Sequence, residues 1–422
     1  MEYIADLHIH SRYAAACSDR LVPENIDAAA KMKGIDVIGT GDFTHPLWFA
    51  ELKKKLEDPD KTGLYRLKGS KTGTRFMLTC EIATIFDSPH PNDYVKKIHN
   101  CVLAPSVEVV EQINDKLAKF GNLQADGRPV LKLSAAGLVE EMHSVSPDIM
   151  VFGAHIWTPW FGALGAFSGF DSIQEAYGDQ AKRIHAVETG LSSDPEMNWR
   201  VSSLDNYSLI SGSDAHSLEK IGREATIFDF GEQQMTFSKI RSKIMEHDTK
   251  MTIEFYPEEG KYHFDGHRNC GVSLSPEESE KYGNICPKCR KRLTVGVLHR
   301  VEKLADRESG EMPHSGRPYV HTVPLQEVIA YVSGKGVKTA YVQGTYDKLV
   351  REFGSEFDVL LKSDTASIEK VDEGLGNAIS RIRDEKVKAI PGYDGVFGIV
   401  DILGRMNVED RKKGRQSTIG DF

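Results

Sequence analysis

The segment Asp6-Leu7-His8-Ile9-His10 has residue types and a spacing that suit metal binding. Successive side chains of an extended strand point to opposite faces, so His8 and His10 share one face while Leu7 and Ile9 take the other. Two imidazoles on one face, at the C-terminal end of a strand, can bind a divalent metal. For a single isolated pair, two ordinary surface histidines would be the better interpretation.

More residues of metal-ligand type follow other strand-like runs or lie within them. They are Asp42, Glu81, His99, His155, Asp214 and His216. Because the ends of parallel strands converge on one face of a barrel, where active sites form, we expect these side chains to gather with His8 and His10. So many ligand-type residues at strand ends would be an odd coincidence in a purely structural core. The sequence therefore predicts a metal centre.

Seven short apolar runs are predicted as the strands that position these residues. They cover 3–9, 35–40, 75–85, 98–103, 149–156, 184–188 and 207–212. Helix-like segments separate several of them, such as Pro23–Lys33, with proline in its first turn, and 106–120, closed by Gly121. Repeated alternation of strand and helix indicates an α/β fold with a parallel sheet, and about seven units suit a barrel.

The rest of the chain follows a different pattern. The alternation ends near 256–260, where proline and acidic residues interrupt it. The part from 301 to 405 is predicted to be mostly helical, with strand-like patches at 339–342 and 359–361. We therefore expect four parts. They are a barrel over 1–250, a zinc-binding module over 251–300, a mostly helical domain over 301–409 and a flexible tail over 410–422.

A second group of metal-ligand residues lies in the predicted module. His267-x2-Cys270 is followed by Cys286-x2-Cys289, and two paired knuckles separated by a loop suit a structural tetrahedral zinc ion. His263 is a rival for the fourth ligand, and a CxxC pair can also have a redox or purely structural role. Basic side chains surround the second knuckle and can contact a phosphate backbone, although such a run is usually a solvated face. They are Lys288, Arg290, Lys291 and Arg292.

The composition narrows the class of protein. The chain has 422 residues, with 62 acidic and 53 basic side chains and a net charge of −9. Hydrophobic residues at 40% and charged residues at 27% exclude disorder as the main state. The sequence contains no run of about 18 apolar residues, so no membrane-spanning helix is predicted. The N-terminus lacks a signal-peptide pattern, and we therefore expect a cytoplasmic protein. The acidic charge argues against indiscriminate nucleic-acid binding but permits a local basic groove.

The last residues of the chain contain a candidate docking motif. Gln416 is followed by an aliphatic side chain, Ile419, and an aromatic one, Phe422. One helical turn would bring Ile419 and Phe422 to one side as a hydrophobic plug. The pattern resembles the box with which DNA-replication and repair proteins bind the sliding clamp. A disordered basic tail that only adds DNA affinity is the alternative, because 411–415 is rich in arginine and lysine.

Five segments of the N-terminal part resemble the ordered metal motifs of the polymerase-and-histidinol-phosphatase (PHP) superfamily. They are DLHIHSR, GDFTHP, TCEIAT, AHIW and SGSDAH. The resemblance implies a distorted seven-unit (β/α) barrel with a trinuclear metal cluster that hydrolyses phosphoesters. The metal ligands that it implies are His8, His10, Asp42, Glu81, His99, His155, Asp214 and His216.

The chain departs from the superfamily pattern in two places. Phe43 stands where the superfamily often has His, and His45 comes two residues later. A further ligand expected after the first motif finds only Cys17 or Asp19. Glu188, in the segment HAVETG, could be a ligand or could orient one.

Over essentially the whole chain, the barrel motifs, the zinc module, the helical C-terminal part and the clamp box together resemble the endonuclease Q family. The most specific part is the middle segment, EEGKYHFDGHRNCG…ICPKCRKRLTVGVLHRVEKLADR. The resemblance implies a metal-dependent repair endonuclease that cuts DNA on the 5′ side of deaminated bases (hypoxanthine, uracil, xanthine) and abasic sites. The products would carry a 3′-OH and a 5′-phosphate.

The same resemblance implies roles for particular residues and partners. The catalytic residues would be His8, His10, Glu81 and Asp214. The cofactors would be a structural Zn²⁺ and two or three catalytic ions, which His and carboxylate ligands leave open as Zn²⁺, Mn²⁺ or Mg²⁺. The helical domain would recognise DNA and its lesions. The protein would be a monomer in the archaeal or bacterial cytoplasm, associated with the nucleoid and with the sliding clamp, and would have no membrane partner.

Aromatic residues near the predicted centre are candidates for contact with a damaged base, which must leave the duplex to be inspected. Trp157, Trp160 and Phe161 follow the strand-like run that ends near His155, and they could stack on such a base. Plain packing of the loop on the barrel is an equally good interpretation.

Two other functions would use the same barrel. A small-molecule phosphatase of the histidinol-phosphate type would have little use for a zinc module, a basic patch or a clamp box. A catalytically inactive, clamp-bound DNA-binding adaptor would have no need to retain nearly all of the ligand types.

Overall fold

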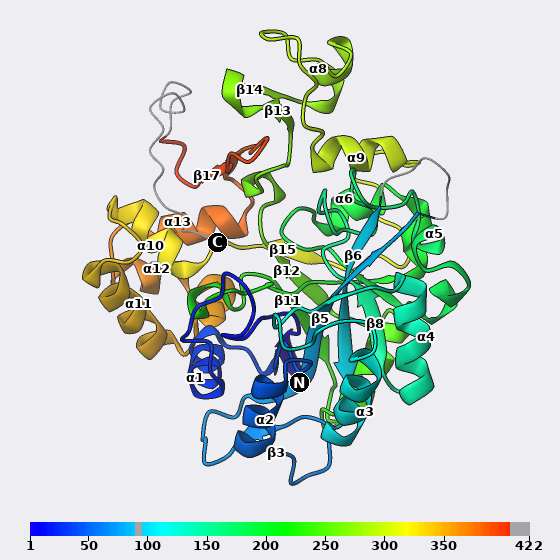
Figure 1. Cartoon of the computed structure of the whole chain (residues 1–422). Coiled ribbons are helices and arrows are strands. Elements are labelled where there is room, and N and C mark those ends of the chain that lie inside the picture. Colours follow the sequence, from blue (N-terminus) through cyan, green and yellow to red (C-terminus); the bar gives the residue numbers. More distant parts are fainter. Residues whose placement is uncertain (89–94, 406–422) are drawn as a thin grey trace.

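The computed structural model of the chain describes residues 1–88 and 95–405. Its centre is one large curved sheet with helices on its outer side (Figure 1). A strand lies in each of the seven runs predicted from the sequence, which confirms the α/β alternation. They are β1 (Glu2–Asp6), β2 (Val37–Gly39), β5 (Arg75–Phe86), β6 (Lys96–Ala104), β8 (Met150–Gly153), β9 (Ala186–Glu188) and β10 (Ser208–Ile210).

These seven strands form a distorted barrel. Their order in the sheet is β10-β9-β8-β6-β5-β2-β1. The segments that follow β10 and β1 close the ring through a parallel bridge between Ile9 and Ala215. At this bridge the backbone N–H of His10 donates to the carbonyl of Ala215 at 3.0 Å, and that of Asp214 donates to the carbonyl of His8 at 2.8 Å. The closure therefore brings the first and last predicted metal motifs side by side.

One strand runs against the expected direction. β6 is antiparallel to both of its neighbours, β5 and β8, whereas the other neighbouring pairs of the barrel are parallel. The expectation of a wholly parallel sheet is wrong at this position. Only residues 87–95 separate β5 from β6, and a parallel pair needs a crossover of about a dozen residues or more. His99 still reaches the C-terminal ends of the neighbouring strands, because it lies in the first half of the reversed strand.

Short elements and helices complete the barrel. β7 (Val130–Leu131) pairs with β5, and β3 (Leu56–Glu57) forms a small hairpin with β4 (Arg66–Leu67). The helices are α1 (Pro23–Lys33), α2 (Pro46–Lys55), α3 (Val107–Leu117), α4 (Ala135–Val145), α5 (Ile173–Tyr177), α6 (Pro195–Trp199) and α7 (Phe237–Met245). The predicted boundaries of the first and third are confirmed to within a few residues. Gly34 ends α1 at a φ of 88°, and the Ser106 side chain caps α3 by accepting from the N–H of Val109.

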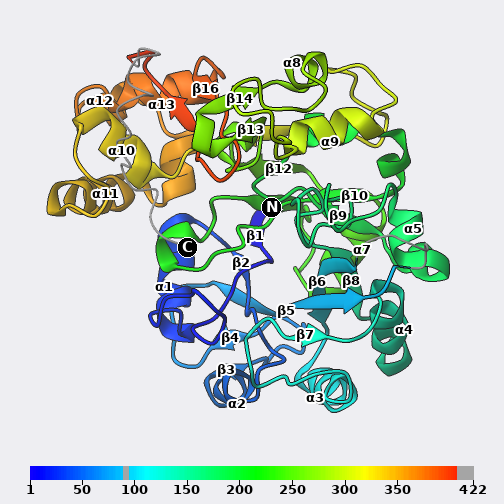
Figure 2. The same ribbon diagram turned by 45° about the horizontal axis from the view of Figure 1, so that its top comes forward.

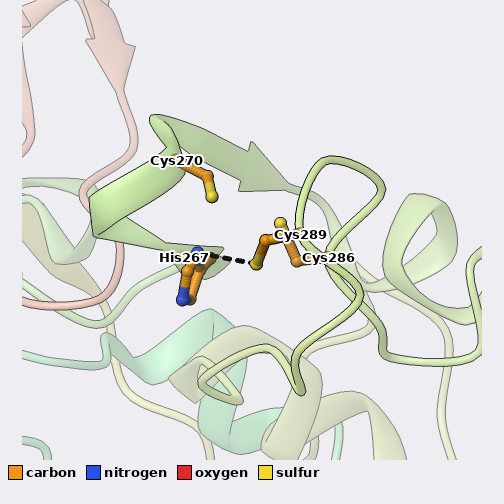
Figure 3. Close-up of side chains that lie close together, drawn as sticks. All are labelled: His267, Cys270, Cys286 and Cys289. Carbon is orange, nitrogen blue, oxygen red and sulfur yellow. Dashed lines mark hydrogen bonds between the residues drawn. The ribbon is translucent and has the colours of Figure 1, made fainter.

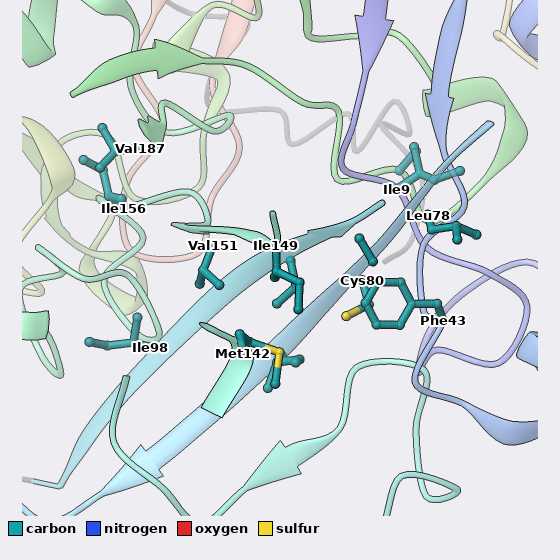
Figure 4. Close-up of a cluster of buried hydrophobic side chains, with 14 of the residues drawn as sticks. Ile9, Phe43, Leu78, Cys80, Ile98, Met142, Ile149, Val151, Ile156 and Val187 are labelled. Carbon is teal, nitrogen blue, oxygen red and sulfur yellow. The ribbon is translucent and has the colours of Figure 1, made fainter. Parts of the chain in front are cut away.

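The alternation of side chains along β5 separates the core from the site. Leu78 and Cys80 pack with Ile9 and Phe43 in the apolar cluster that includes residues of the surrounding helices (Figure 4). Met77 belongs to a different buried cluster, and Glu81 shares its face because the two are an even number of residues apart. The strand therefore turns Leu78 and Cys80 toward one core and places Met77 and Glu81 on the other face.

Three further strands extend the sheet beyond the barrel. β11 (Ala225–Asp229) is antiparallel to β1, β12 (Met251–Glu254) is antiparallel to β11, and β15 (Tyr319–His321) is parallel to β12. The segment between β12 and β15 contains β13 (Asp265–His267), β14 (Val272–Leu274), α8 (Pro276–Lys281) and α9 (Val297–Leu304). Figure 2 shows this segment and the C-terminal helices along one side of the barrel.

The C-terminal part is mostly helical and has its own apolar cluster. It contains α10 (Leu325–Ser333), α11 (Ala340–Phe353), α12 (Thr365–Glu369), α13 (Leu375–Arg383), a π-helix (Asp358–Lys362) and the hairpin of β16 (Lys388–Ile390) and β17 (Ile399–Asp401). The two predicted strand-like patches are wrong. Thr339 caps α11 through the N–H of Val342, and 359–361 lies in the π-helix, because burial among helices outweighs β-propensity there. The predicted domain boundaries stay predictions. Among the described residues, no helix has the length and apolar character to cross a membrane.

Candidate metal centre and nucleic-acid interface

The predicted ligand residues come from all seven strands of the barrel. His8 and His10 follow β1, Asp42 follows β2, Glu81 and His99 lie in β5 and β6, His155 follows β8, Glu188 ends β9, and Asp214 and His216 follow β10. Three of these residues have left-handed backbones, with φ of 49° at Asp42, 30° at His155 and 46° at Asp214. Such conformations are uncommon for residues other than glycine, and they concentrate at functional sites, where surrounding contacts hold them.

The carboxylate of Glu81 lies at the middle of the cluster and is almost fully buried. Its Oε1 is 2.6 Å from His99 Nδ1 and 2.9 Å from His155 Nε2. Its Oε2 is 3.1 Å from His10 Nε2 and 3.6 Å from His8 Nε2. One carboxylate therefore faces two pairs of imidazoles, which is the arrangement of a ligand that bridges two neighbouring metal positions.

Asp214 completes the first of these two positions. Its Oδ1 is 3.1 Å from His10 Nε2 and 3.7 Å from His8 Nε2. These three atoms are buried and have no hydrogen-bond partner among the described residues. Buried polar atoms are normally paired, so their convergence fits a site built for a cation. Imidazole and carboxylate donors suit Zn²⁺ or Mn²⁺, and four ligand-type side chains here lie within 4.8 Å of one another.

Two further carboxylates lie behind the imidazoles. Glu188 accepts from His8 Nδ1 at 2.9 Å and from the backbone N–H of His155 at 2.7 Å. Asp42 accepts from His10 Nδ1 at 2.9 Å. A carboxylate on Nδ1 fixes the tautomer in which Nε2 offers its lone pair to a metal. Glu188 and Asp42 are therefore placed to orient His8 and His10, and Asp42 belongs to none of the close ligand groups found among the described residues.

The pKa shifts of the residues at the centre reflect a surplus of negative charge there. Burial works against ionisation of Glu81, yet His99 and Arg128 hold the pKa of this carboxyl well below its ordinary value. Burial would lower the pKa of His10, yet Asp42 and Asp214 raise it well above its ordinary value. The site therefore attracts positive charge, and a divalent cation would take the place of bound protons.

Arg128 is a site residue that the sequence interpretation missed. Its Nη1 donates to Glu81 Oε2 at 3.0 Å, and its side chain is 26% exposed. It lies in the loop before β7, outside any strand-end pattern, so no local signal identifies it. The loop is held close to the centre, because a Cβ on the neighbouring Gly127 would come within 2.5 Å of Asp42 Oδ2.

The remaining predicted ligands lie farther out. The ring of His216 is 4.7 Å from that of His10, and its Nδ1 bonds to the backbone carbonyl of Asp214 at 2.9 Å. His45 stacks on Tyr13 at 4.4 Å between ring centroids. Neither His216 nor His45 belongs to the close ligand groups found among the described residues, and the same is true of Cys17 and Asp19.

The second predicted metal site is also assembled. His267 comes from the end of β13, Cys270 from the turn that follows, and Cys286 and Cys289 from a facing loop (Figure 3). Their ligand atoms lie within 4.8 Å of one another, and His267 Nδ1 is 3.6 Å from the Sγ of Cys289. His263 is buried elsewhere and is not part of this group. Three sulfurs and one imidazole suit a tetrahedral zinc ion.

The nearby basic side chains are exposed, as a nucleic-acid contact requires. They are Lys288, Arg290, Lys291 and Arg292.

The predicted aromatic contacts divide into two classes. Trp157 is fully buried and its Nε1 donates to Asn198 at 2.8 Å, so the expectation that it stacks on a base is wrong in this structure. Trp160 is 40% exposed. The predicted clamp-binding residues Gln416, Ile419 and Phe422 lie outside the described residues.

Comparison with known proteins identifies relatives of the whole chain. A family model described as the MJ0043 C-terminal domain matches residues 324–386, which contain α10 to α13. The uncharacterized protein YqxK of Bacillus subtilis is 29% identical and is matched over 93% of this chain and 98% of its own length. The uncharacterized protein MJ0043 of Methanocaldococcus jannaschii is 32% identical over 61% of this chain, and the match spans 33% of that relative's length.

Two solved structures share both fold and sequence with the chain. One is the lesion-specific endonuclease PfuEndoQ from Pyrococcus furiosus, with 31% identity, 98% of this chain and 99% of that chain covered, and a TM-score of 0.84. The other is endonuclease Q in complex with a 27-mer duplex substrate that has an abasic lesion at the active site. That match has 31% identity, covers 97% of this chain and 100% of that chain, and has a TM-score of 0.83.

Proposed function

The chain belongs to the endonuclease Q family, and from that premise we propose that it is a metal-dependent DNA repair endonuclease. It hydrolyses the phosphodiester on the 5′ side of hypoxanthine, uracil, xanthine and abasic sites, and it leaves a 3′-OH and a 5′-phosphate. The observation that carries the proposal is the convergence of His8 Nε2, His10 Nε2 and Asp214 Oδ1, three buried atoms for which the described residues supply no hydrogen-bond partner. It occurs in a chain that matches lesion-specific endonucleases along nearly its whole length.

The residues of the centre fit the needs of phosphodiester hydrolysis. When bound, a pair of divalent metals about 3.5–4 Å apart neutralises charge on the attacking and leaving oxygens. Glu81 would hold the two metal positions together, with His8, His10 and Asp214 on one side and His99 and His155 on the other. Arg128 adds a fixed positive charge at the partly exposed side of the cluster, where an anionic phosphate can approach.

Recognition of the lesion requires that the damaged nucleotide leave the stack. Damaged and abasic positions cost less to open than intact pairs, which favours a nuclease that inspects extruded nucleotides. The exposed cations beside the second zinc knuckle supply phosphate contacts for such a complex. The structural zinc would hold these cations in place by fixing the loop that carries them.

The decisive experiment uses duplex oligonucleotides with a single hypoxanthine, uracil, xanthine or abasic site, and an undamaged duplex as control. We expect a nick on the 5′ side of each lesion in the presence of Mn²⁺, Mg²⁺ or Zn²⁺ and no nick in the control. Extension of the upstream strand by a DNA polymerase identifies the 3′-OH, and direct resealing of the nick by DNA ligase identifies the 5′-phosphate. Hydrolysis of p-nitrophenyl phosphate without cleavage of any lesion duplex would instead indicate a small-molecule phosphatase and would refute the proposal.

Partners outside the barrel belong to the same proposal. Residues Gln416, Ile419 and Phe422 would bind a sliding clamp and recruit the enzyme to DNA, while the chemistry proceeds without the clamp. The enzyme would act as a monomer in the cytoplasm, associated with the nucleoid. Size-exclusion chromatography with light scattering tests the monomer, and a pull-down with the clamp tests the recruitment.

A further inference from the structure

An exposed pair of stacked aromatic rings lies beside the candidate metal centre. Trp160 and Phe167 have ring centroids 4.9 Å apart and an interplanar angle of 13°, and they remain 40% and 39% exposed. Tyr262 meets the Trp160 ring edge-on, at 5.1 Å and 77°. Large aromatic rings are costly to leave in water, so an exposed, ordered stack of this kind marks a binding surface.

The stack is joined directly to the metal centre. Phe161, the residue after Trp160, packs on the ring of His99 at 4.4 Å, and its carbonyl accepts from the backbone N–H of His99 at 2.8 Å. Lys97 Nζ lies 5.5 Å from the centre of the Phe161 ring. A nucleotide next to a phosphodiester at the metals would therefore lie within reach of this surface.

The loop that carries the stack is tightly folded. The N–H of Phe167 donates to the carbonyl of Pro159 at 3.0 Å, which draws the two ends of the loop together. A Cβ on Gly162 would come within 2.5 Å of the Ile156 carbonyl oxygen, so only glycine fits this close approach. Because the rings are held before any partner arrives, little ordering entropy opposes binding.

Cationic side chains lie near the segments that carry the aromatic rings. Lys97 lies on the side of the metal centre, and Lys261 precedes Tyr262, with its Nζ 4.6 Å from the centre of the Phe397 ring. Arg268 is exposed, and its guanidinium and the Tyr262 hydroxyl both lie beside Gly395. Aromatic rings interleaved with cations are the arrangement by which proteins hold unpaired nucleic-acid strands: the rings stack on bases and the cations neutralise phosphates.

We propose that Trp160, Phe167 and Tyr262 form a stacking platform for an unpaired nucleobase of the DNA, one or two nucleotides away from the lesion. The platform holds the strand open on one side of the extruded lesion, and this inference rests on the proposed nuclease function. Because every base has an apolar face, the contact is independent of sequence. A platform of this kind keeps the duplex from closing again before cleavage.

A binding cycle tests the platform in the full chain carrying Asp214→Asn, so that the complex is not consumed. The DNA is a duplex with one abasic lesion, and abasic spacers replace single nucleotides at successive positions on both sides of it. Affinity is measured by fluorescence anisotropy for Trp160 and for Trp160→Ala. We expect Trp160→Ala to weaken binding about 5- to 150-fold with an unchanged salt dependence, because a base contact and no phosphate contact is lost. In the parent chain, the spacer at one position should weaken binding by the same factor as Trp160→Ala does. In the Trp160→Ala chain, that spacer should cause no further loss of affinity.

Controls separate stacking from damage to the fold. Trp160→Phe should retain most of the affinity. Met312→Ala, which removes a more exposed apolar side chain elsewhere, should bind as the parent chain does. Equal losses at every spacer position in both chains, or an unchanged affinity of Trp160→Ala, would overturn the platform and leave the stack as a surface for another protein. If the wild-type chain nicks lesion duplexes in that case, only this inference fails. If it nicks none, the proposed function fails independently.

Discussion

Glu188 offers the sharpest test of the metal centre, because its replacement leaves every direct ligand in place. The Glu188→Gln side chain has nearly the same shape but only one acceptor oxygen. The oxygen that accepts from the backbone N–H of His155 at 2.7 Å also lies 2.9 Å from His8 Nδ1. The new NH₂ group takes the place of the second carboxylate oxygen, 3.0 Å from the same Nδ1. The Glu188 side chain is only 1% exposed, so close packing limits its freedom to rotate away.

The size of the effect follows from the tautomer of His8. The amide replaces a charged acceptor by one neutral oxygen and places an NH₂ group beside Nδ1, so a proton on Nδ1 is less favoured. The tautomer whose Nε2 lone pair faces the metal is therefore less populated. Loss of such an orienting partner costs about 10- to 100-fold in metal affinity, or about 1.4–2.7 kcal/mol. Asp42→Asn makes the same change behind His10, so it should cause a loss of similar size.

Nicking of a lesion duplex at increasing Mn²⁺ concentration measures this effect. We expect the activation midpoint of Glu188→Gln to rise about 10- to 100-fold while activity at saturating metal recovers substantially. Glu219→Gln, at a surface carboxylate paired with Arg20, is the matched control and should keep the wild-type midpoint. A midpoint within about twofold of wild type in a normally folded Glu188→Gln protein would refute the role of the carboxylate in orienting His8.

Three further predictions concern the two metal sites and the tail. Asp214→Asn should abolish nicking even at high metal concentration and leave DNA binding largely intact, as measured by cleavage and anisotropy; near-normal nicking would remove Asp214 from the centre. Cys286→Ser should lower the zinc content by one ion per chain and destabilise the module, which mass spectrometry and limited proteolysis report; an unchanged zinc content would contradict the site. Removal of 416–422 should abolish clamp binding but spare nicking of a short oligonucleotide. Calorimetry of a tail peptide should give micromolar affinity, about −8 kcal/mol, that both Ile419→Ala and Phe422→Ala weaken, and indifference to both would leave the basic-tail interpretation.

The clustering of the ligand-type residues was predictable because their signal is local. His8 and His10 follow a short apolar strand, and a period of two places both on one face whatever surrounds them. Glu81 follows the apolar residues of the first half of β5, and Asp214 follows β10; a closed barrel brings such positions together. The order of these motifs along the chain was therefore enough to predict the cluster, although which carboxylates face the metals and which lie behind imidazoles required coordinates.

What the sequence did not predict depends on contacts between distant segments. The direction of β6 is decided by the short connection from β5. Arg128 reaches the centre from a loop that has no periodic pattern. Trp157 and Trp160 are three residues apart with equal propensities, yet one is buried by Asn198 and its neighbours and the other is exposed. The burial and position of such side chains depend on contacts with distant segments, and these contacts leave no local pattern in a single sequence.

The pairing of β12 with β15 has a consequence for any attempt to divide the protein into fragments. The zinc segment is inserted between two strands that lie next to each other, so both of its ends are joined to the barrel sheet. A fragment that stops before β12 would leave β11 as an open edge, and unpaired strand edges recruit other chains and promote aggregation. Truncations within the inserted segment would instead leave β12 as the open edge, unless residues up to His321 are supplied in trans or rejoined by a short linker. The nuclease half and the helical half are therefore expected to be expressed in soluble form together, rather than as separate pieces.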